Sequence, residues 1–476
     1  MANIAQSINN AVEPASVAIN NIIFYKITLF DVAIPVVVIW LILAALILTV
    51  SLRFINIRSF GHAWHLTFHR EPTNPNTKGE ISHFQALTSA LSGTVGLGNI
   101  ASVPIAIVLG GPGALFWMVL AGILGMSSKF AECALAVKYR RTDQDGRVHG
   151  GPMYYIEDIV AKRAGKLHAG FGKGLGKFSA VFFAVMTMGA SISVFQVNQA
   201  HSLFADVTGH SIPLTFGIIM ASGVAIVIVS GIKTIGRVTS ILVPLMGAIY
   251  LSAGLTIIFA NISAVPGAIM LILKGAFGLE AAGGGLVGAL IIGIQRATYS
   301  SEAGVGSAAI AHAAVRTDNP LTEGYVALLE PFIDTVVICS VTALVIIVTG
   351  VYEPFVGQDN LQGIVMTSAA FESMFSWYPV ILLISVILFA FSTLIAWAYY
   401  GAEAAAYLFG TTKRVDIIFK LLLCLALSTG AAIQLSAIVN FIDAMLFGMC
   451  IPNIIALYLL LPELKSDVRA YETARK

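Results

Sequence analysis

The feature that most restricts the fold of this chain is a series of long apolar segments. A membrane-spanning helix needs about 20 mainly apolar residues. Eleven segments satisfy this requirement, with approximate limits at 27–52, 83–109, 113–138, 179–205, 213–231, 238–260, 286–314, 325–350, 378–408, 415–433 and 436–461. Because lipid offers no hydrogen-bond partners, each segment must satisfy its backbone groups internally. We therefore predict an all-α polytopic membrane protein with about 11 transmembrane helices.

The composition supports this class and argues against others. Of the 476 residues, 57% are hydrophobic and 11% are charged, whereas a soluble domain carries about 25% charged residues. The net charge of +2 gives no reason to expect nucleic acid as a partner. The chain has no nucleophile elbow, Walker loop or HExxH motif. We expect neither an enzyme nor a bound cofactor.

Basic residues are unevenly distributed between alternate loops. The predicted loops 53–82 and 139–178 hold twelve Lys and Arg residues in total, whereas the loop 351–377 holds none. Basic residues near the ends of spans remain on the cytoplasmic side of a membrane. The pattern therefore predicts an N-terminus outside the cell and a cytoplasmic C-terminus.

A short glycine-rich motif occurs twice. Residues 92–99 (SGTVGLGN) and 300–307 (SSEAGVGS) both fit S-x-x-x-G-x-G followed by a small polar residue. The two copies lie five spans apart, so they enter the membrane in opposite directions, as in an inverted-topology repeat. Chance is the alternative, because the chain has 44 glycines and membrane helices use Gly and Ser for close packing.

The repeat predicts an organisation of the chain into four parts. An N-terminal segment with one added helix and a basic loop is expected at 1–82, and a cytoplasmic tail at 462–476. The five-helix repeats are expected at 83–260 and 261–461.

Each motif predicts a break in its helix, because Gly disfavours a continuous helix by about 1 kcal/mol relative to Ala. A break exposes backbone groups, which lipid tolerates only where they line a cavity or hold a ligand. A helix N-terminus suits a carboxylate, whereas carbonyl and hydroxyl oxygens suit a dehydrated cation. Two breaks could therefore hold an amino acid and a sodium ion together.

Other polar residues at membrane depth are candidates for the same site. Gln196, Asn198 and Gln199 lie in the fourth span, and Ser392, Thr393 and Trp397 lie in the ninth span. Amide groups can hydrogen-bond to both the ammonium and the carboxylate of a zwitterionic amino acid. A hydroxyl oxygen beside an indole ring suits a cation that binds next to a pocket for a small side chain. The alternatives are hydrogen bonding between helices for the amides and ordinary packing for the second group.

Charged residues interrupt the seventh span. Glu302 could be a cation ligand, a proton-titrating group or a partner for Arg296, six positions earlier. The pair with Arg296, as a structural or gating contact, is the interpretation we favour. Lys129, Glu132 and Asp334 are expected to stabilise the bundle or a gate, and Glu403 and Asp443 to be solvated at span ends.

Five stretches resemble the sodium:alanine symporter family, also called alanine or glycine:cation symporters, and the resemblance extends over about residues 25–465. The stretches are Ser92-Gly-Thr-Val-Gly-Leu-Gly-Asn-Ile100, Lys129-Phe-Ala-Glu-Cys133, Ala136-Val-Lys-Tyr-Arg140, Gly150-Gly-Pro-Met-Tyr-Tyr-Ile156 and Ser301-Glu-Ala-Gly-Val-Gly-Ser307. The first is also similar to the first core helix of neurotransmitter:sodium symporters. The resemblance implies a five-plus-five inverted-repeat, leucine-transporter-like core with discontinuous helices, preceded by one extra helix.

The resemblance also implies a location for each ligand. It assigns the substrate to Gly93, Thr94, Gly96, Gln196, Asn198, Thr393 and Trp397. It assigns sodium to Ser92, Val95, Ser392 and Thr393. A gating or seventh-span site is expected among Arg296, Ser301, Glu302 and Gly304. The segment 191–195 departs from the expected pattern, which leaves the size of the pocket open.

The implied function is secondary active import of alanine or glycine with sodium across a prokaryotic inner membrane, by alternating access. Proton coupling through Glu302 is the main alternative, and a non-transporting sensor or a channel of the same fold is a weaker one. The expected partners are the amino acid, sodium and lipid. The sequence leaves the oligomeric state undetermined.

Overall fold

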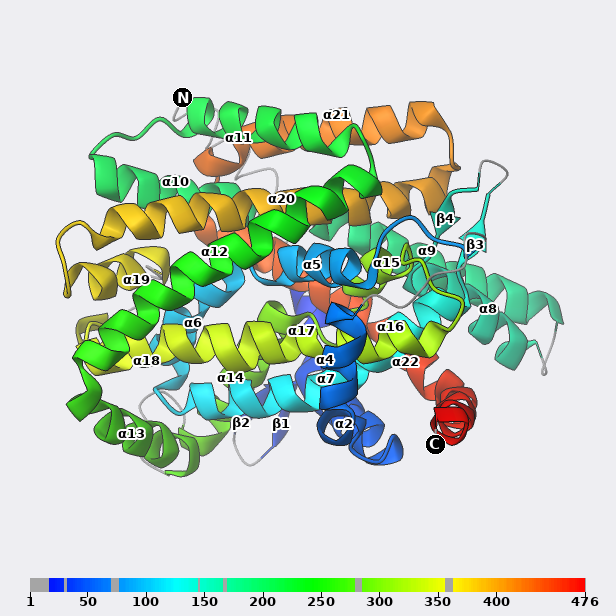
Figure 1. Cartoon of the computed structure of the whole chain (residues 1–476), viewed down its shortest axis with the longest axis horizontal. Coiled ribbons are helices and arrows are strands. Elements are labelled where there is room, and N and C mark those ends of the chain that lie inside the picture. The colour runs from blue at the N-terminus through cyan, green and yellow to red at the C-terminus, as the bar shows by residue number, and fades with distance from the viewer. Residues whose placement is uncertain are drawn as a thin grey trace.

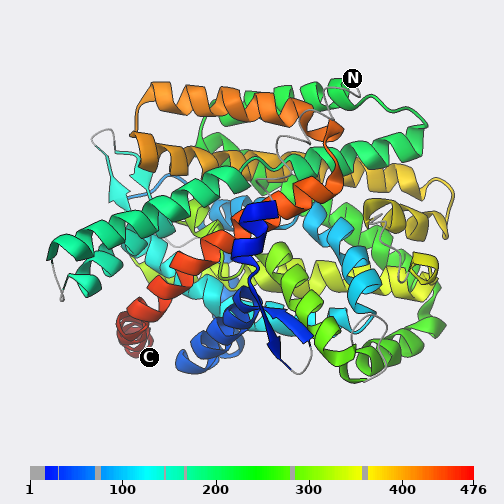
Figure 2. The same ribbon diagram turned by 180° about the vertical axis from the view of Figure 1, so that it is seen from behind.

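The computed structural model describes residues 17–29, 32–69, 77–143, 146–165, 169–278, 285–355 and 363–475. The described part is almost entirely helical, and most helices run roughly along the long axis of the molecule (Figures 1 and 2). The longest are α12 (Ile232–Ala260), α20 (Tyr378–Phe409) and α22 (Leu435–Arg475). The two extreme segments, 1–16 and the last residue, lie outside the described residues.

The predicted first span is helical in only part of its length. Lys26–Leu29 (β1) and Val32–Pro35 (β2) pair as antiparallel strands, and α2 begins at Val36 and ends at Ser51. The prediction of helix from residue 27 is therefore wrong. Pro35 explains the boundary, because proline biases the residue before it towards extended backbone.

The helices of the first half cover the predicted spans, and four of them lie in the predicted loops. They are α3 (Ile55–Arg58), α4 (Phe60–Phe68), α5 (His83–Thr94), α6 (Leu97–Gly110), α7 (Ala114–Lys138), α8 (Pro152–Ala164), α9 (Ala169–Ala190), α10 (Val194–Thr208), α11 (Pro213–Ile228), α12 and α13 (Val265–Phe277). Two short strands, β3 (Arg141–Thr142) and β4 (Val148–His149), form a hairpin after α7. A 3-10 turn, η1 (Ile262–Ala264), precedes α13.

The second half contains a comparable series. It comprises α14 (Gly285–Ser301), α15 (Ala308–His312), α16 (Pro320–Ala327), α17 (Leu329–Pro331), the π-helix η2 (Phe332–Cys339), α18 (Ser340–Thr349), η3 (Glu353–Phe355), α19 (Gly363–Glu372), α20, α21 (Lys413–Thr429), η4 (Gly430–Ala432) and α22. From α16 to α18 the chain forms one nearly continuous helical span, Pro320–Thr349. Helix α13 lies at one end of the bundle, as a connection between the halves (Figure 1).

Seven of the described helices are long and apolar enough to cross a membrane, and the bent pair α5–α6 makes an eighth. Three shorter apolar helices occur at Val36–Ser51, Pro213–Ile228 and Ile262–Phe277. The membrane class is thus confirmed, whereas the number eleven stays a prediction.

The final helix continues well past the predicted end of the last span at residue 461. Its extension packs against α7 and α3 through ion pairs: Lys138 Nζ lies 2.7 Å from Glu463 Oε1 and also contacts Asp467, and Arg58 lies 2.6 Å from Glu472. The segment 462–475 is therefore helical, because charged groups along it have partners on neighbouring helices.

A buried histidine joins the β3–β4 hairpin to α20. His149 Nδ1 lies 2.8 Å from Glu403 Oε2, and His149 Nε2 lies 3.2 Å from Asp143 Oδ2. Glu403 is only 5% exposed, so the expectation that it is solvated is wrong. Its hydrogen bond to the ring raises the pKa of His149 above the ordinary value, despite the opposing effect of burial.

We expect a His149→Gln variant to lose stability at low pH and little at high pH. A histidine whose folded pKa is raised contributes stability fully below its unfolded pKa of about 6.5, and this contribution disappears as pH rises through the folded pKa. A hydrogen bond to a charged group contributes roughly 1.5–3 kcal/mol. Melting temperatures of both proteins at pH 6 and pH 9 test this: a difference that is equal at both values would contradict it.

Candidate functional site

The second predicted span is broken where its glycine motif lies. Helix α5 ends at Thr94, α6 begins at Leu97, and the two are bent by 41°. In a continuous helix the amides of Gly96 and Leu97 would bond to the carbonyls four residues earlier. Here the Gly96 amide donates to Thr94 O at 3.0 Å, and the Leu97 amide donates to Gln196 Oε1 at 3.1 Å. The carbonyls of Ser92 and Gly93 thereby lose their helical donors.

Gly96 lies against two other candidate residues. A Cβ built on Gly96 would lie 2.5 Å from Thr393 Oγ1, and 3.3 Å and 3.4 Å from the amide atoms of Gln196. Thr393 Oγ1 is buried and has no hydrogen-bond partner within the described part of the chain. The break, the fourth span and the ninth span thus converge at one point.

The seventh predicted span is also broken. Helix α14 ends at Ser301, α15 begins at Ala308, and Glu302, Gly304 and Gly306 between them have φ angles of 52°, 88° and 89°. Glycine adopts this left-handed backbone freely, whereas a non-glycine residue there is held at a cost of about 1–3 kcal/mol and often marks a functional position. Glu302 is such a residue.

Both breaks border one small cavity at the centre of the bundle, with a volume of about 20 Å³. That is room for one or two water molecules. Its lining residues come from α5, α6, α14, α20, α22 and the segment around the start of α10: Gly93, Thr94, Gly98, Ala190, Ser193, Phe195, Gln196, Tyr299, Glu302, Trp397, Ile442 and Leu446. The structure therefore brings together most of the residues expected to bind substrate.

Glu302 lies at this cavity but has a different partner from the one we favoured. Its Oε2 accepts a hydrogen bond from the Ser307 hydroxyl, and Trp397 also hydrogen-bonds its carboxylate. Arg296 instead pairs with Asp443 Oδ2 at 3.2 Å. The Arg296–Glu302 pair is therefore wrong, because α22 supplies a nearer carboxylate to the arginine.

The Arg296–Asp443 pair joins α14 to α22 beside the cavity. Both side chains are nearly buried, with exposed fractions of 11% and 8%, so the expectation that Asp443 is solvated is also wrong. Arg296 lies 5.7 Å from the ring centre of Tyr299, which lines the cavity. The pair therefore links α14 to α22 next to a residue of the cavity wall.

The proposed sodium ligands lie where α5 meets α20. Ser92 Oγ donates to Ser392 O at 2.6 Å, and Ser392 Oγ donates to Phe389 O at 3.0 Å. Val95 occupies the break itself, directly after α5. Hydroxyl and carbonyl oxygens of α5 and α20 thus lie close together next to Thr393 in the chain, and oxygen atoms are the ligands of a small hard cation.

Three of the expected site residues lie elsewhere. Asn198 Nδ2 donates to Ile433 O at 2.8 Å, so the amide holds α10 to η4. Ser301 donates to Ala297 O at 2.9 Å, and the Gly304 carbonyl accepts from Asn453 at 2.9 Å. None of the three lines the central cavity.

Sequence reasoning missed a third break and a polar cluster. Helix α9 ends at Ala190 and α10 begins at Val194, and the departure from the family pattern at 191–195 was the available signal. Asn99 Nδ2 donates to Ser300 Oγ at 3.0 Å and to the Asp334 carbonyl at 3.1 Å. Asp334 Oδ2 is buried without a hydrogen-bond partner in the described residues, in a π-helix, a feature frequent at functional sites.

Comparisons with known proteins agree with this geometry. The sequence profile of the sodium:alanine symporter family matches residues 18–476. The sodium/alanine symporter AgcS of Methanococcus maripaludis is 38% identical over 448 residues, which cover 93% of this chain and 95% of the relative. A probable sodium/glutamine symporter, GlnT of Bacillus subtilis, is 32% identical over 430 residues, covering 90% and 86%.

A solved structure shows the same fold. The crystal structure of MhsT in complex with L-phenylalanine matches with a TM-score of 0.56 at 14% identity, over 80% of this chain and 89% of that chain. The leucine-transporter-like fold is therefore confirmed. The chain belongs to the sodium:alanine symporter family and is a sodium-coupled amino-acid transporter, not an enzyme.

Proposed function

We propose that this transporter imports alanine or glycine with sodium, and that the substrate binds in the central cavity. The supporting observation is the size of that cavity, about 20 Å³ between Phe195, Tyr299 and Trp397. Even a small amino acid requires these walls to move slightly, and the longer side chain of glutamine would require a larger rearrangement. Close packing makes such enlargement costly, by about 1–3 kcal/mol for an overfilled core.

The amino acid is held by the broken helices in this proposal. Its carboxylate meets the N-terminus of α6, where a carboxylate oxygen takes the place of Gln196 Oε1, which accepts a hydrogen bond from the Leu97 amide. A helix N-terminus carries a partial positive charge that favours an anion. Its ammonium group faces Glu302, and its side chain faces Trp397, both of which line the cavity.

Sodium binds beside the substrate in this proposal, among oxygens of Ser92, Val95, Ser392 and Thr393. The Ser92–Ser392 bond supports this position, since it fixes α5 against α20. Sodium there orders the break and lowers the conformational cost of binding the amino acid. A membrane potential of 100 mV contributes about 2.3 kcal/mol for each charge moved, which corresponds to roughly 50-fold accumulation.

Transport follows alternating access in this proposal. In it, residues 83–260 and 261–461 are two inverted five-helix repeats, each with one broken helix. The bundle that contains both broken helices rocks against the other helices. The basic loops face the cytoplasm, and the Arg296–Asp443 pair closes the outer side.

Uptake of labelled alanine, glycine and glutamine into proteoliposomes tests this function. We expect uptake of alanine or glycine under an inward sodium gradient, little uptake under potassium or proton gradients alone, and at least tenfold less uptake of glutamine. Uptake that does not depend on the sodium gradient would contradict sodium coupling. Faster uptake of glutamine than of alanine and glycine would contradict the proposed substrate.

A Thr393→Ala variant tests the sodium position. Loss of one oxygen ligand is expected to raise the half-saturating sodium concentration about tenfold, which equals about 1.4 kcal/mol. Ser385→Ala is the matched control on the same helix, because Ser385 Oγ donates to Ile381 O, away from both breaks. Equal sodium dependence in the two variants would show that Thr393 is not a sodium ligand.

A further inference from the structure

The segments next to the two broken helices lie against each other. Residues 77–82 lead directly into α5, and residues 313–318 directly follow α15. Ile81 and Val315 form a parallel β-bridge, and the Arg316 amide donates to Ile81 O at 2.8 Å. We call these two segments together the junction.

A single arginine spans the junction. Arg140 follows the end of α7, and its Nη1 donates to Ala313 O at 2.9 Å and to Val315 O at 2.6 Å. Its Nη2 donates to Lys78 O at 3.0 Å and to Thr317 O at 2.8 Å. The planar guanidinium presents its donors in a rigid fork. One side chain therefore holds both segments and ties them to α7.

Glycines allow the close approach of the parts that Arg140 joins. Gly79 has a φ angle of 130°, and a Cβ built on it would lie 2.1 Å from Val315 O. A Cβ on Gly150 would lie 2.4 Å from Ala313 Cβ and 3.1 Å from Arg140 Cβ. At Gly79 both the backbone angle and the lack of space require glycine, so the sequence there is adapted to this contact.

A buried carboxylate joins the same two helices a second time. Glu323 on α16 contacts His83 Nδ1 at the start of α5, and its Oε1 lies 2.5 Å from His312 Nδ1 at the end of α15. The side chains of Glu323 and His312 are fully buried. Arg140 and Glu323 thus connect α5 and α15 to each other and to α7 and α16.

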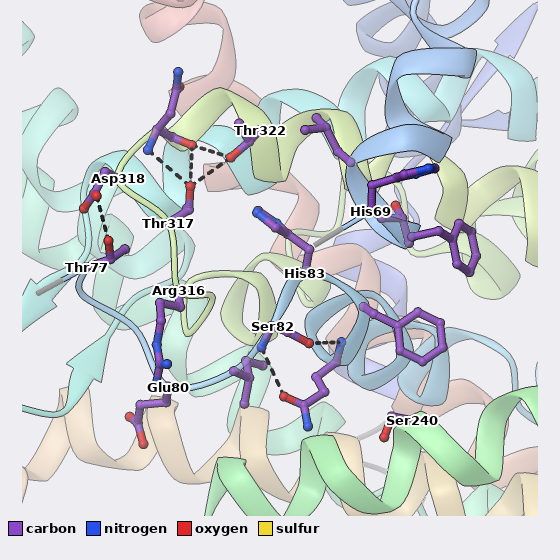
Figure 3. A pocket seen from close by; sticks show the side chains of 17 residues that line it. His69, Thr77, Glu80, Ser82, His83, Ser240, Arg316, Thr317, Asp318 and Thr322 are labelled. Atoms are coloured by element: carbon purple, nitrogen blue, oxygen red, sulfur yellow. Dashed lines mark hydrogen bonds between the residues drawn. The ribbon is translucent and has the colours of Figure 1, made fainter. Parts of the chain in front are cut away.

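The junction is open to solvent through a crevice of about 1030 Å³. The crevice is lined by residues of both segments, by the end of α4 and by Ser240 of α12. Thr77 Oγ1 donates to Asp318 Oδ2 at 2.7 Å, and Figure 3 shows these two side chains pointing towards each other in the crevice. A reagent in water can therefore reach one residue of each segment.

The alternative is that Arg140 only caps α15. The last carbonyls of a helix lack intrahelical donors, and basic side chains often satisfy them. Ala313 O and Val315 O fit this interpretation. Lys78 O does not, because it belongs to the segment before α5. A cap for one helix does not explain an arginine that joins two.

We propose that Arg140 is a positioning residue for transport, which holds α5 and α15 together so that the two broken helices move as one body. The proposed sodium site lies between α5 and α20, whereas the proposed substrate site borders both breaks. Coupling between two sites requires an element whose equilibrium both ligands shift. The junction provides it, because a connected α15 must follow α5. Without Arg140, α5 would respond to sodium alone, and uptake would lose its dependence on sodium.

The first test compares Arg140→Lys with Arg141→Lys in proteoliposomes. Lysine keeps the charge of Arg140 but lacks the rigid fork. Arg141 is the matched control, since its side chain is 50% exposed and lies 2.9 Å from Asp158, outside the junction. We measure alanine uptake under an inward sodium gradient and divide it by uptake without sodium. This ratio is expected to fall at least fivefold in Arg140→Lys and to keep the parent value in Arg141→Lys.

A purely structural role for Arg140 would lower both uptakes together, so a ratio that stays at the parent value in Arg140→Lys would overturn the proposal. The inference rests on the proposed function, and the two failures differ. Uptake by the parent protein that does not depend on sodium would contradict sodium coupling itself. Sodium-dependent uptake by the parent, with an unchanged ratio in the variant, would contradict the role of Arg140 alone.

A cross-link across the junction tests the proposal with Arg140 in place. Thr77→Cys/Asp318→Cys puts two thiols where these side chains now meet, and a short bifunctional thiol reagent joins them. Cys424, which is partly buried, is replaced by serine in these proteins. The cross-linked protein is expected to keep sodium-driven uptake, and the same cross-link is expected to restore the ratio in Arg140→Lys. Loss of uptake on cross-linking would show that the two segments separate during transport, which would overturn the proposal.

Discussion

Replacing Gly96 by alanine is expected to lower the transport efficiency of this protein about 100-fold, without unfolding it. The added methyl group would lie 2.5 Å from Thr393 Oγ1 and against the Gln196 amide. Overfilling a packed position costs about 1–3 kcal/mol, and about 2.7 kcal/mol corresponds to 100-fold. The φ angle of Gly96 is −131°, which alanine adopts freely, so backbone strain contributes nothing.

Initial rates of sodium-driven alanine uptake, measured at several alanine concentrations, give this effect. Gly247→Ala on α12 is the control, since a Cβ there would meet nothing within 4 Å. The control is expected to transport normally. A Gly96→Ala variant that transports as well as Gly247→Ala would show that the break does not border the substrate.

Lys129→Met is expected to destabilise the folded protein by about 3–5 kcal/mol. The Lys129 and Glu330 side chains are both fully buried, and removing one member of a buried pair leaves the other charge without compensation. The same reasoning predicts that Lys129→Met/Glu330→Gln recovers part of the loss, because it removes both charges. The expected fall in melting temperature for the single variant is roughly 3–5 °C.

Thermal unfolding followed with a thiol-reactive dye measures these differences, because Cys133, Cys339 and Cys450 are buried until the bundle opens. Lys138→Met is the matched control on the same helix. Lys138 also pairs with two carboxylates, but its side chain is 32% exposed, and exposed pairs contribute about 0–1 kcal/mol. Equal melting temperatures for Lys129→Met and Lys138→Met would contradict the account of the buried pair.

Features of the structure that depend on backbone preferences over a few residues could be predicted from the sequence. The glycine motifs marked the breaks at Val95 and Glu302, because backbone preference acts within a few residues. Apolar length located most of the helices but missed the early start of α9 at Ala169, the extension of α22 to Arg475 and the strands at residues 26–35, where Pro35 and the β-branched residues before it favour a hairpin.

Pairings between distant residues could not be read from the sequence. Arg296 has a carboxylate six positions away in Glu302, yet its partner is Asp443 on the last helix. The choice depends on how α14 and α22 pack, and no periodicity encodes that. Asn198 was misplaced for the same reason, since its amide found the Ile433 carbonyl. The buried contacts of Glu323 with His83 and of Glu330 with Lys129 likewise connect residues that are distant along the chain.

The central claim is that the two broken helices hold the amino acid between them, and an experimental density map of the protein with alanine and sodium tests it most directly. The account predicts density for alanine bounded by Gly93, Gly98, Glu302 and Trp397, with its carboxylate at the start of α6. Alanine bound elsewhere, with both breaks unoccupied in a protein that transports it, would contradict the account.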